Sequence, residues 1–394
     1  MLIAALLVAL YFAAYAVLIH YYLYSWKRIP IPITPEQTPT TKVSILIPLR
    51  NESYRFSELL RSLQSQDYPR ELLEVILIND HSQDDTLEKA LRAQVSSPLK
   101  IQVINLQDHL DPNRLLLAYK KKALEVGIQQ AEGTLIVTTD ADCTASPGWI
   151  RTLVSNYETF HYKMMIAPVK ITPRPGILSA FQSLDFLVLQ GITGAALQAR
   201  FHTLCNGANL AYEKAVFMEV GGFQGIDQTP SGDDMLLLYK VYNKYPDQIG
   251  YIKHPECIVV TQPETTWKAL IQQRTRWASK ADWYQDQRVL QVLLFVYGFN
   301  LLFVAGLGYS LVDTRVGIFV AAGLLVKTLI EWPFVAAVAS FFRQSYLLKG
   351  FPVFQPLHIV YVLVVGALGK WGNFEWKGRK VKAAALKQRA LLDR

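Results

Sequence analysis

Long apolar stretches stand at both ends of the chain, and a mainly polar region separates them. Met1–Trp26 carries no charged side chain, and tyrosine and tryptophan gather at its far end, as in the aromatic belt of a membrane span. A cleaved signal peptide is the alternative, but the stretch lacks the basic start and the short apolar centre of such a peptide. Val292–Val312 and Val316–Phe342 also have span length, whereas Val353–Gly369 is marginal and contains Pro356. The pattern predicts an integral membrane protein with a large polar middle.

In the polar middle, short β-rich runs alternate with helical patterns. Strands are predicted for Val43–Ile47, Glu74–Ile78, Ile101–Leu106, Leu135–Thr138 and Met164–Val169. Helices are predicted for Ser57–Gln66, Thr86–Gln94 and Leu115–Ala131. This alternation predicts βαβ units and a mostly parallel sheet, and therefore an α/β fold class. Ligands of such sheets bind beyond the carboxyl ends of the strands.

Two carboxylates, Asp140 and Asp142, follow the strand predicted for Leu135–Thr138. Alternate residues of an extended chain point to the same side, so both carboxylates can face one site. Mg²⁺ and Mn²⁺ are usually bound by few carboxylates together with substrate phosphates, which suits this pair. A solvated turn is the alternative explanation for the Asp-x-Asp pattern taken alone.

Two further groups of polar residues lie in the second half of the polar middle. Asp233 and Asp234 open a helical run, Met235–Val241, where N-capping explains one of the acids. Farther on, Gln273, Arg276 and Trp277 share one face of a helix predicted for Trp267–Ser279. A guanidinium and an indole on one face suit a diphosphate and a sugar or adjoining chain. A helix at the lipid headgroups is the alternative.

Charge predicts the orientation of the chain. Lys27, Arg28 and Lys42 follow the first span, which places the polar middle in the cytoplasm by the positive-inside rule. Much of the net charge of +8 lies in Lys377–Arg394, which indicates a cytoplasmic basic tail at anionic headgroups, or simply a solvated end. No nucleic-acid motif accompanies this charge, so nucleic acid is not expected as a partner. Three cysteines without metal spacing, Cys143, Cys205 and Cys257, fit a reducing compartment.

A pair of opposite charges, Lys327 and Glu331, lies within the apolar stretch Val316–Phe342. The two residues are four positions apart, so an ion pair on one helix lowers the cost of burying them. Intramembrane charges usually face protein or a cavity. Both a structural pair and a role near the head group of an acceptor remain open.

Together these residues resemble the membrane-bound family 2 glycosyltransferases, which include cellulose, chitin and hyaluronan synthases and ceramide glucosyltransferase. The similarity runs from about Val43 to Trp277 and implies a GT-A fold. The matching elements are Ser44–Glu52, Asn79–Ser82, Lys120–Leu124, Asp140 with Asp142, Asp233 with Asp234, and Gln273 with Arg276 and Trp277. Asp233 stands where the family has Glu, and the membrane part is smaller than that of processive synthases.

The resemblance implies a role for each matching residue. Donor-binding residues are implied at Pro48, Arg50, Asn51, Glu52, Asp80, Lys120, Asp140, Gln273, Arg276 and Trp277. Asp142, supported by Asp140, would bind Mg²⁺ or Mn²⁺ at the diphosphate of a nucleotide sugar, a UDP-sugar by preference. Asp234 would act as the base, with Asp233 near the acceptor and Arg274 assisting Arg276. A single base implies inversion at the anomeric carbon.

The predicted protein is thus an inverting hexosyltransferase of a bacterial inner or plasma membrane that acts on a membrane-embedded or lipid-linked acceptor. A polysaccharide synthase is the alternative. A transporter or an inactive binding module fits less well, because the polar middle is large and its acids are intact. The predicted divisions are a span at 1–26, a cytoplasmic GT-A domain at 42–285, membrane or interfacial helices at 289–372 and a basic tail at 373–394. A cytoplasmic tail requires an even number of later crossings, so Val353–Gly369 is predicted to be re-entrant or interfacial.

Overall fold

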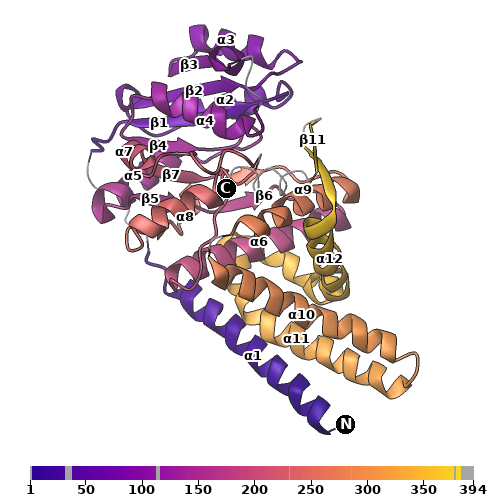
Figure 1. Ribbon diagram of the computed structural model, residues 1–394. Coiled ribbons are helices and arrows are strands. Elements are labelled where there is room, and N and C mark those ends of the chain that lie inside the picture. Colours follow the sequence, from indigo (N-terminus) through magenta and orange to yellow (C-terminus); the bar gives the residue numbers. More distant parts are fainter. Residues whose placement is uncertain are drawn as a thin grey trace. The chain divides into compact units, whose positions relative to one another are not determined.

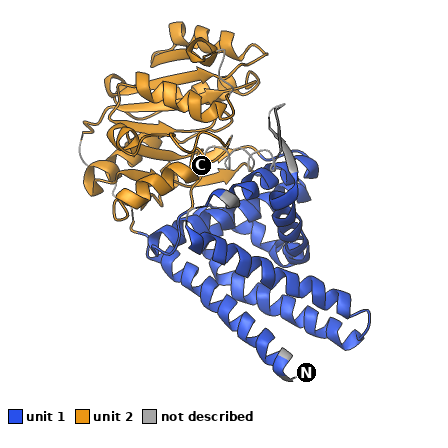
Figure 2. Ribbon diagram, in the orientation of Figure 1, with its two compact units in different colours: residues 1–29, 173–203, 263–389 blue, residues 30–172, 204–262, 390–394 orange. Residues whose placement is uncertain are grey.

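The computed structural model describes residues 2–31, 38–111, 116–229, 231–284, 286–376 and 379–382. These residues form two units, each assembled from separate stretches of the chain (Figure 2). The sheet unit contains the described residues of 30–172 and 204–262, and the helical unit those of 1–29, 173–203 and 263–389. Residues 173–203 and 263–285, which fall within the predicted GT-A domain, are therefore grouped with the apolar helices. The domain boundaries drawn from the sequence stay a prediction.

A seven-stranded, mostly parallel sheet forms the centre of the sheet unit (Figure 1). Its order is β3-β2-β1-β4-β7-β5-β8, and β7 runs antiparallel to both of its neighbours. The strands are β1 Val43–Leu49, β2 Leu73–Asn79, β3 Lys100–Asn105, β4 Leu135–Thr138, β5 Met164–Ile166, β7 Leu210–Glu213 and β8 Ile249–Tyr251. The predicted α/β class is confirmed.

The mostly apolar strands β1, β2 and β4 are buried along almost their whole length, as expected for a parallel sheet that is covered on both faces. Helix α4, Tyr119–Gln130, packs closely on this sheet at Gly127. A Cβ atom added to Gly127 would lie 3.1 Å from side-chain atoms of Ile78 and Leu46. The small residue therefore lets the helix approach β1 and β2. The other helices of the unit are α2 Phe56–Gln64, α3 Thr86–Ser96, α5 Trp149–Phe160, α7 Lys214–Glu219 and α8 Met235–Lys244.

Two sequence predictions need correction here. The run Met164–Val169 was predicted as one strand, but β5 ends at Ile166 and a separate strand, β6 Val169–Ile171, pairs with β9 Val259–Thr261. Pro168 stands at the break and has no N–H to donate to a ladder. The helix predicted from Leu115 begins only at Tyr119. Residues 112–115 lie outside the described part of the chain.

Five helices in the described residues are long and apolar enough to cross a membrane. Four of them match the predicted stretches: α1 Leu2–Lys27, α10 Gln287–Tyr309, α11 Thr314–Phe341 and α12 Phe351–Trp371. The last is a continuous helix of 21 residues that includes Pro356, so the stretch is longer than the sequence suggested. Whether it crosses the membrane fully or is re-entrant stays a prediction.

The fifth long helix, α6 Ile177–Gln198, was not predicted. Its apolar window is 67% buried within the protein, against 17–28% for the other four, and it packs on α1 and α11. The amphipathic helix α9, Trp267–Ala278, packs on α12 in the same unit. Short helical turns and a hairpin complete the described chain: η1 Arg70–Leu72, η2 Leu106–His109, η3 Pro255–Cys257, η4 Ser279–Trp283, η5 Ser345–Lys349, β10 Asn373–Trp376 and β11 Arg379–Lys382. Most of the predicted basic tail lies outside the described residues.

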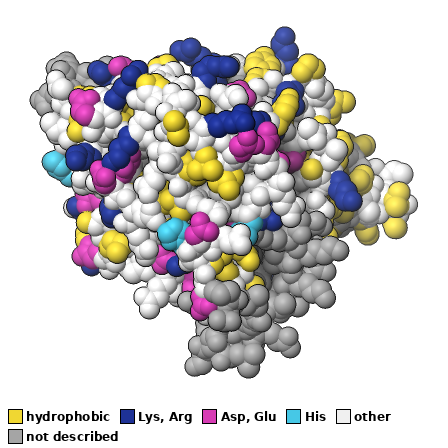
Figure 3. Space-filling view, turned by 90° about the horizontal axis from the view of Figure 1, so that it is seen from above, with side chains coloured by type: hydrophobic (Ala, Val, Ile, Leu, Met, Phe, Trp, Pro, Cys, Tyr) yellow, Lys and Arg dark blue, Asp and Glu magenta, His cyan; other side chains and the backbone are white. Residues whose placement is uncertain are grey.

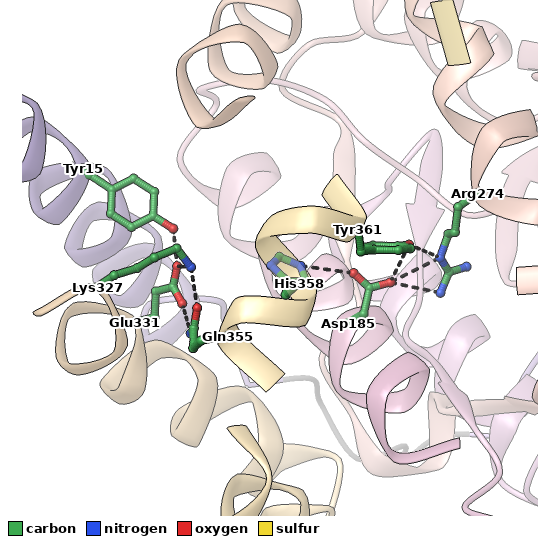
Figure 4. A network of polar contacts seen from close by, with 8 residues as sticks. All are labelled: Tyr15, Asp185, Arg274, Lys327, Glu331, Gln355, His358 and Tyr361. Carbon is green, nitrogen blue, oxygen red and sulfur yellow. Dashed lines mark hydrogen bonds and ion pairs between the residues drawn. The ribbon is translucent and has the colours of Figure 1, made fainter. Parts of the chain in front are cut away.

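Lys327 and Glu331 form the predicted ion pair on α11, with 2.7 Å between Nζ and Oε1 (Figure 4). Lys327 Nζ also donates to Gln355 Oε1 of α12 at 2.6 Å, and Gln355 Nε2 donates to Glu331 Oε2. The hydroxyl of Tyr15 on α1 completes the network by donating to Glu331. These contacts join three helices of span length, which explains how the charges are buried. A role near the head group of an acceptor stays a prediction.

Basic and acidic side chains are mixed on the face shown in Figure 3, where hydrophobic side chains lie between them. Some exposed ion pairs join residues four positions apart at α3, such as Arg92 with Glu88, and Lys89 with Asp85 at the N-cap. Solvent screens exposed pairs of this kind, so they contribute little to stability.

Candidate active site

The parallel strands bring three loops to the same edge of the sheet. Leu49 at the end of β1 lies opposite Asn79 at the end of β2, and Leu46 of β1 lies opposite Thr138 at the end of β4. The residues that follow these strands contain Arg50, Asp80 and Asp140. The expected clustering at the carboxyl edge is therefore present in the fold.

The loops after β1 and β2 hold each other in place. Arg50 Nη1 donates to the backbone carbonyl of Asp80 at 3.1 Å and lies 3.7 Å from its carboxylate. Asn51 Oδ1 accepts the backbone N–H of Gln83 at 2.8 Å, and the backbone N–H of Glu52 donates to Thr86 Oγ1 at 2.9 Å. Asn51 and His81 have φ values of +53° and +54°, in the left-handed region that side chains other than glycine rarely adopt. Pro48, paired with Ile78, lies one residue before the end of β1.

Lys120 connects two acidic groups that are far apart in the sequence. It lies in the first turn of α4, and its Nζ is 2.8 Å from Asp140 Oδ1 and 3.0 Å from Asp233 Oδ2. Burial lowers the pKa of Lys120, but the two carboxylates outweigh burial and raise it above its ordinary value. Lys120 thus remains a cation, and it joins the Asp-x-Asp segment after β4 to the acids before α8.

Asp142 points toward a second group of side chains. Its Oδ2 accepts from Thr261 Oγ1 at 3.1 Å and lies 3.5 Å from Arg55 Nη1. The side chain of Asp142 is only half-buried. Within the described residues there is no group of three or more His, Cys, Asp or Glu side chains that could bind a metal by themselves. Two hard carboxylates near a substrate diphosphate are nonetheless a sufficient protein contribution for Mg²⁺ or Mn²⁺, so the residues present fit such an ion.

Asp234 is buried and occupies the N-cap of α8. Its Oδ1 accepts the backbone N–H of Met235 at 2.7 Å, and its Oδ2 accepts that of Gly207 at 3.1 Å. The capping explanation is therefore correct for Asp234, while Asp233 contacts Lys120. A Cβ atom on Gly207 would lie 3.1 Å from Asp233 Oδ2, so the loop Asn206–Asn209 closely approaches both acids. This loop was not among the predicted site residues.

The residues of α9 lie in the helical unit, where Arg274 takes part in a network of polar contacts with α6 and α12 (Figure 4). The buried Arg274 donates from Nε to Asp185 Oδ2 of α6 at 3.2 Å and to Tyr361 Oη of α12 at 3.0 Å. His358 Nε2 of α12 lies 3.5 Å from the other oxygen of Asp185. This buried network was missed, because the sequence gives no sign that Asp185 and Arg274 are neighbours.

Arg274 also contacts two of the predicted site residues of α9, Gln273 and Trp277. Its Nη1 donates to Gln273 Oε1 at 2.8 Å, and its guanidinium lies 4.1 Å from the centre of the Trp277 ring. Gln273 Nε2 donates in turn to Glu264 at 2.8 Å. Arg276 and Trp277 are half-buried. Arg274 is thus engaged with Asp185, and its predicted part in neutralising a diphosphate stays a prediction.

Residues 39–279 match the family described as "Glycosyltransferase like family 2". The chain belongs to the family 2 glycosyltransferases. It is 26% identical over 242 residues to the probable glycosyltransferase YdaM of Bacillus subtilis. The aligned region covers 60% of this chain and 54% of that protein. It is 23% identical over 330 residues to the poly-beta-1,6-N-acetyl-D-glucosamine synthase of Staphylococcus epidermidis, which covers 80% of this chain and 74% of that protein. The chain thus spans about half the length of the Bacillus relative.

Among solved structures, the fold is similar to that of a mannosyltransferase from Pyrobaculum calidifontis, PcManGT, determined in complex with GDP-Man and Mn²⁺. The TM-score is 0.54 at 19% sequence identity, and the match covers 92% of this chain and 98% of that one. The predicted family and the GT-A fold are confirmed. The roles assigned to individual residues stay predictions.

Proposed function

We propose that the protein transfers a sugar, with inversion, from a nucleotide-diphosphate sugar to an acceptor hydroxyl, and that the donor is a UDP-sugar. The observation that carries this proposal is the position of Lys120 between Asp140 and Asp233. Asp140 belongs to the segment assigned to the donor, and Asp233 precedes the assigned base. Donor and acceptor groups would therefore meet in one cluster at the carboxyl edge of the sheet, where such sheets bind ligands.

Asp234 is proposed as the base. Two backbone N–H groups, from Met235 and Gly207, donate to its carboxylate and hold the side chain in one orientation. Asp234 would take the proton of the acceptor hydroxyl as it attacks the anomeric carbon. With one base and no carboxylate assigned as nucleophile, a single displacement with inversion follows.

The donor would be held by the residues that the family resemblance assigns to it. Asp80 with Arg50, Asn51 and Glu52 would hold the nucleoside, and Asp140 the ribose. Asp142 with Asp140 would hold Mg²⁺ or Mn²⁺, which supplies positive charge to the diphosphate. Arg276 would neutralise the departing nucleoside diphosphate, because its planar guanidinium can bind two oxygens at once.

The test of the base is Asp234→Asn, compared with Asp67→Asn, which alters an exposed acid that pairs with Arg151. Purified protein in lipid is incubated with UDP- and GDP-sugars, and nucleotide release and sugar transfer are measured. Asp234→Asn should bind the donor nucleotide and lose transfer, while Asp67→Asn should match the wild type. Transfer by Asp234→Asn within tenfold of the wild-type rate would remove Asp234 from the base role.

We further propose a membrane-embedded or lipid-linked acceptor and a cytoplasmic sheet unit. The support is that α9, with Gln273, Arg276 and Trp277, belongs to the same unit as the five helices of span length. Efficient glycosylation of a water-soluble acceptor without lipid would contradict this acceptor class. For the orientation, a single cysteine near residue 390 should resist labelling from outside intact cells, and ready labelling would contradict a cytoplasmic tail.

A polysaccharide synthase is the second candidate, because the Staphylococcus relative is named as one and aligns with 80% of this chain. The two candidates differ in product size. A single transfer gives one product that is one sugar longer than the acceptor, whereas a synthase gives a ladder or a polymer. Chromatography of the radiolabelled product after long incubation with excess donor distinguishes them.

A further inference from the structure

The segment that leads to the proposed base has an irregular backbone. We call the described residues of 221–232 the glycine loop, and it ends directly before Asp233 and Asp234. Four of its glycines, at positions 221, 222, 225 and 232, have φ between +48° and +84°. Because glycine loses much conformational freedom on folding, a loop of this composition is costly to hold in one shape. Contacts from outside the loop are therefore needed to fix it.

Two lysines supply those contacts by gathering backbone carbonyl groups. Lys121 Nζ donates to the carbonyl oxygens of Ile226, Thr229 and Ser231, the latter two at 2.9 Å each. Lys240 of α8 does the same for the first part of the loop, where it donates to the carbonyls of residues 221, 222 and 224. An ammonium group has three donors, and in each case three loop carbonyls receive them. The half of the loop next to Asp233 is held by Lys121.

Lys121 is an unusual core residue. Only 1% of its surface is exposed, and burial of an ammonium group is strongly unfavourable unless the charge is fully hydrogen-bonded. An apolar side chain would fill the same space without that cost. The buried ammonium group is instead satisfied by hydrogen bonds to three carbonyl groups of the glycine loop.

Three consecutive lysines at the start of α4 lie in three different environments. Lys120 contacts Asp140 and Asp233, Lys121 contacts the glycine loop, and Lys122 forms a half-exposed pair with Glu125 at 2.9 Å. The first turn of α4 thus holds both the acid Asp233 and the backbone that precedes it. Lys122 offers a matched control, since it has the same side chain in the same turn.

We propose that Lys121 is a positioning residue for Asp234, which acts by fixing the glycine loop and does not itself touch substrate. The proposal rests on the assignment of Asp234 as the base. A base must lie within hydrogen-bond reach of the proton that it accepts, so even a small displacement of Asp234 slows transfer. Lys121 should accordingly affect the rate of transfer and leave donor binding unchanged.

The experiment compares Lys121→Met, Lys121→Arg, Lys122→Met and Asp234→Asn in the full-length protein in lipid. For each variant, UDP release from the UDP-sugar that gives the highest wild-type rate is measured in the same lipid to obtain kcat and donor KM, and melting temperature and UDP affinity report folding. Lys121→Met should lower kcat by at least about tenfold, with donor KM and nucleotide affinity within twofold of wild type. Lys122→Met should change neither constant by more than twofold. Lys121→Arg keeps the charge and the N–H donors, so its kcat should lie between those of Lys121→Met and the wild type.

Wild-type kcat in folded Lys121→Met, or an equal loss in Lys121→Met and Lys122→Met, would overturn the proposal. A loss confined to donor KM would also overturn it. If Lys121→Met does not fold, Lys121→Gln decides, because glutamine lacks the charge and has only two N–H donors for the three carbonyls. Wild-type kcat in folded Lys121→Gln would refute the positioning role. Asp234→Asn separates the two claims. An active Asp234→Asn refutes the base assignment itself, whereas an inactive Asp234→Asn beside a normal Lys121→Met refutes only the role of Lys121.

Discussion

Replacing Lys120 with methionine removes the cation between Asp140 and Asp233 and keeps most of the side-chain volume. The side chain of Asp233 is 12% exposed and that of Lys120 is 18% exposed. The Lys120–Asp233 contact is therefore better shielded from solvent than the Lys120–Asp140 contact. A hydrogen bond to a charged group in such a place contributes about 2 kcal/mol. The side chain of Asp140 is 39% exposed. Solvent screening therefore reduces the contribution of the Lys120–Asp140 pair to stability to about 0.5 kcal/mol. We therefore expect Lys120→Met to lower the free energy of unfolding by about 2–3 kcal/mol.

For a sheet unit of about 200 residues, that loss corresponds to a fall in melting temperature of about 5–10 °C. The carboxylates raise the pKa of Lys120 above its ordinary value of 10.5. A raised pKa means that the stabilisation is fully present below the ordinary value and is lost only as pH rises through the raised one. The difference between variant and wild type should thus be constant between about pH 6 and pH 9.

Thermal unfolding of both proteins in the same detergent, followed by circular dichroism, measures this difference. Lys122→Met is the control, because its partner Glu125 is three residues away on an exposed face and the pair contributes about 0.5 kcal/mol or less. Lys120→Met should also lose at least about tenfold in transfer rate, since both acids lose their common partner. Equal melting temperatures for Lys120→Met and Lys122→Met would refute the reasoning.

Three further variants test other parts of the site. Asp142→Asn should abolish transfer and weaken metal-dependent nucleotide binding while the melting temperature stays within about 2 °C of wild type, as expected for a half-exposed side chain; full activity in excess chelator would contradict this. Arg276→Lys keeps the charge but loses the planar fork, so transfer should fall by at least about tenfold at unchanged expression, and full activity would exclude a diphosphate contact. Asp185→Asn removes the carboxylate that pairs with the buried charge of Arg274. It should therefore lower the free energy of unfolding, measured by thermal unfolding, by about 3–5 kcal/mol. Adding Arg274→Gln should recover most of that loss, and additive losses would show that the two residues are not coupled.

The regular part of the fold could be predicted because local patterns determine it. The apolar runs of β1, β2 and β4 have no helical period, and acids or turn residues end them. The antiparallel strand β7 was not predicted, since its four residues include Ala211 and Glu213, two residue types that strands disfavour. Helix α6 was missed for a different reason. It is buried on most sides and carries the polar residues Gln182 and Asp185, so neither a lipid-facing run nor an amphipathic stripe is visible.

The site was predictable only as far as residue types and spacing reach. Asp140, Asp233 and Lys120 could be named from motifs, but their mutual contact depends on the fold. Lys121 lies one position from Lys120 and is chemically identical to it, so nothing in the sequence indicates that one binds acids and the other binds carbonyl groups. Long-range packing decides such differences.

The assembly of the helical unit from three separate stretches of chain has a consequence during synthesis. Asp185 and Arg274 are 89 residues apart, so at about 5–20 residues per second the carboxylate of α6 waits roughly 5–20 s for its partner. An unpaired carboxylate is costly in hydrocarbon, so insertion of α6 into lipid before α9 has been made would be unfavourable. Tyr15 and Glu331 are 316 residues apart, so α1 waits roughly 15–60 s for α11. The one charged side chain of α1, Lys27, lies in its last turn, so the apolar remainder of the helix can stay in the bilayer alone. Helix α11 then arrives with Lys327 and Glu331 already neutralising each other on its own surface. Final packing of the membrane helices is thus a late event that follows completion of the sheet unit at residue 262.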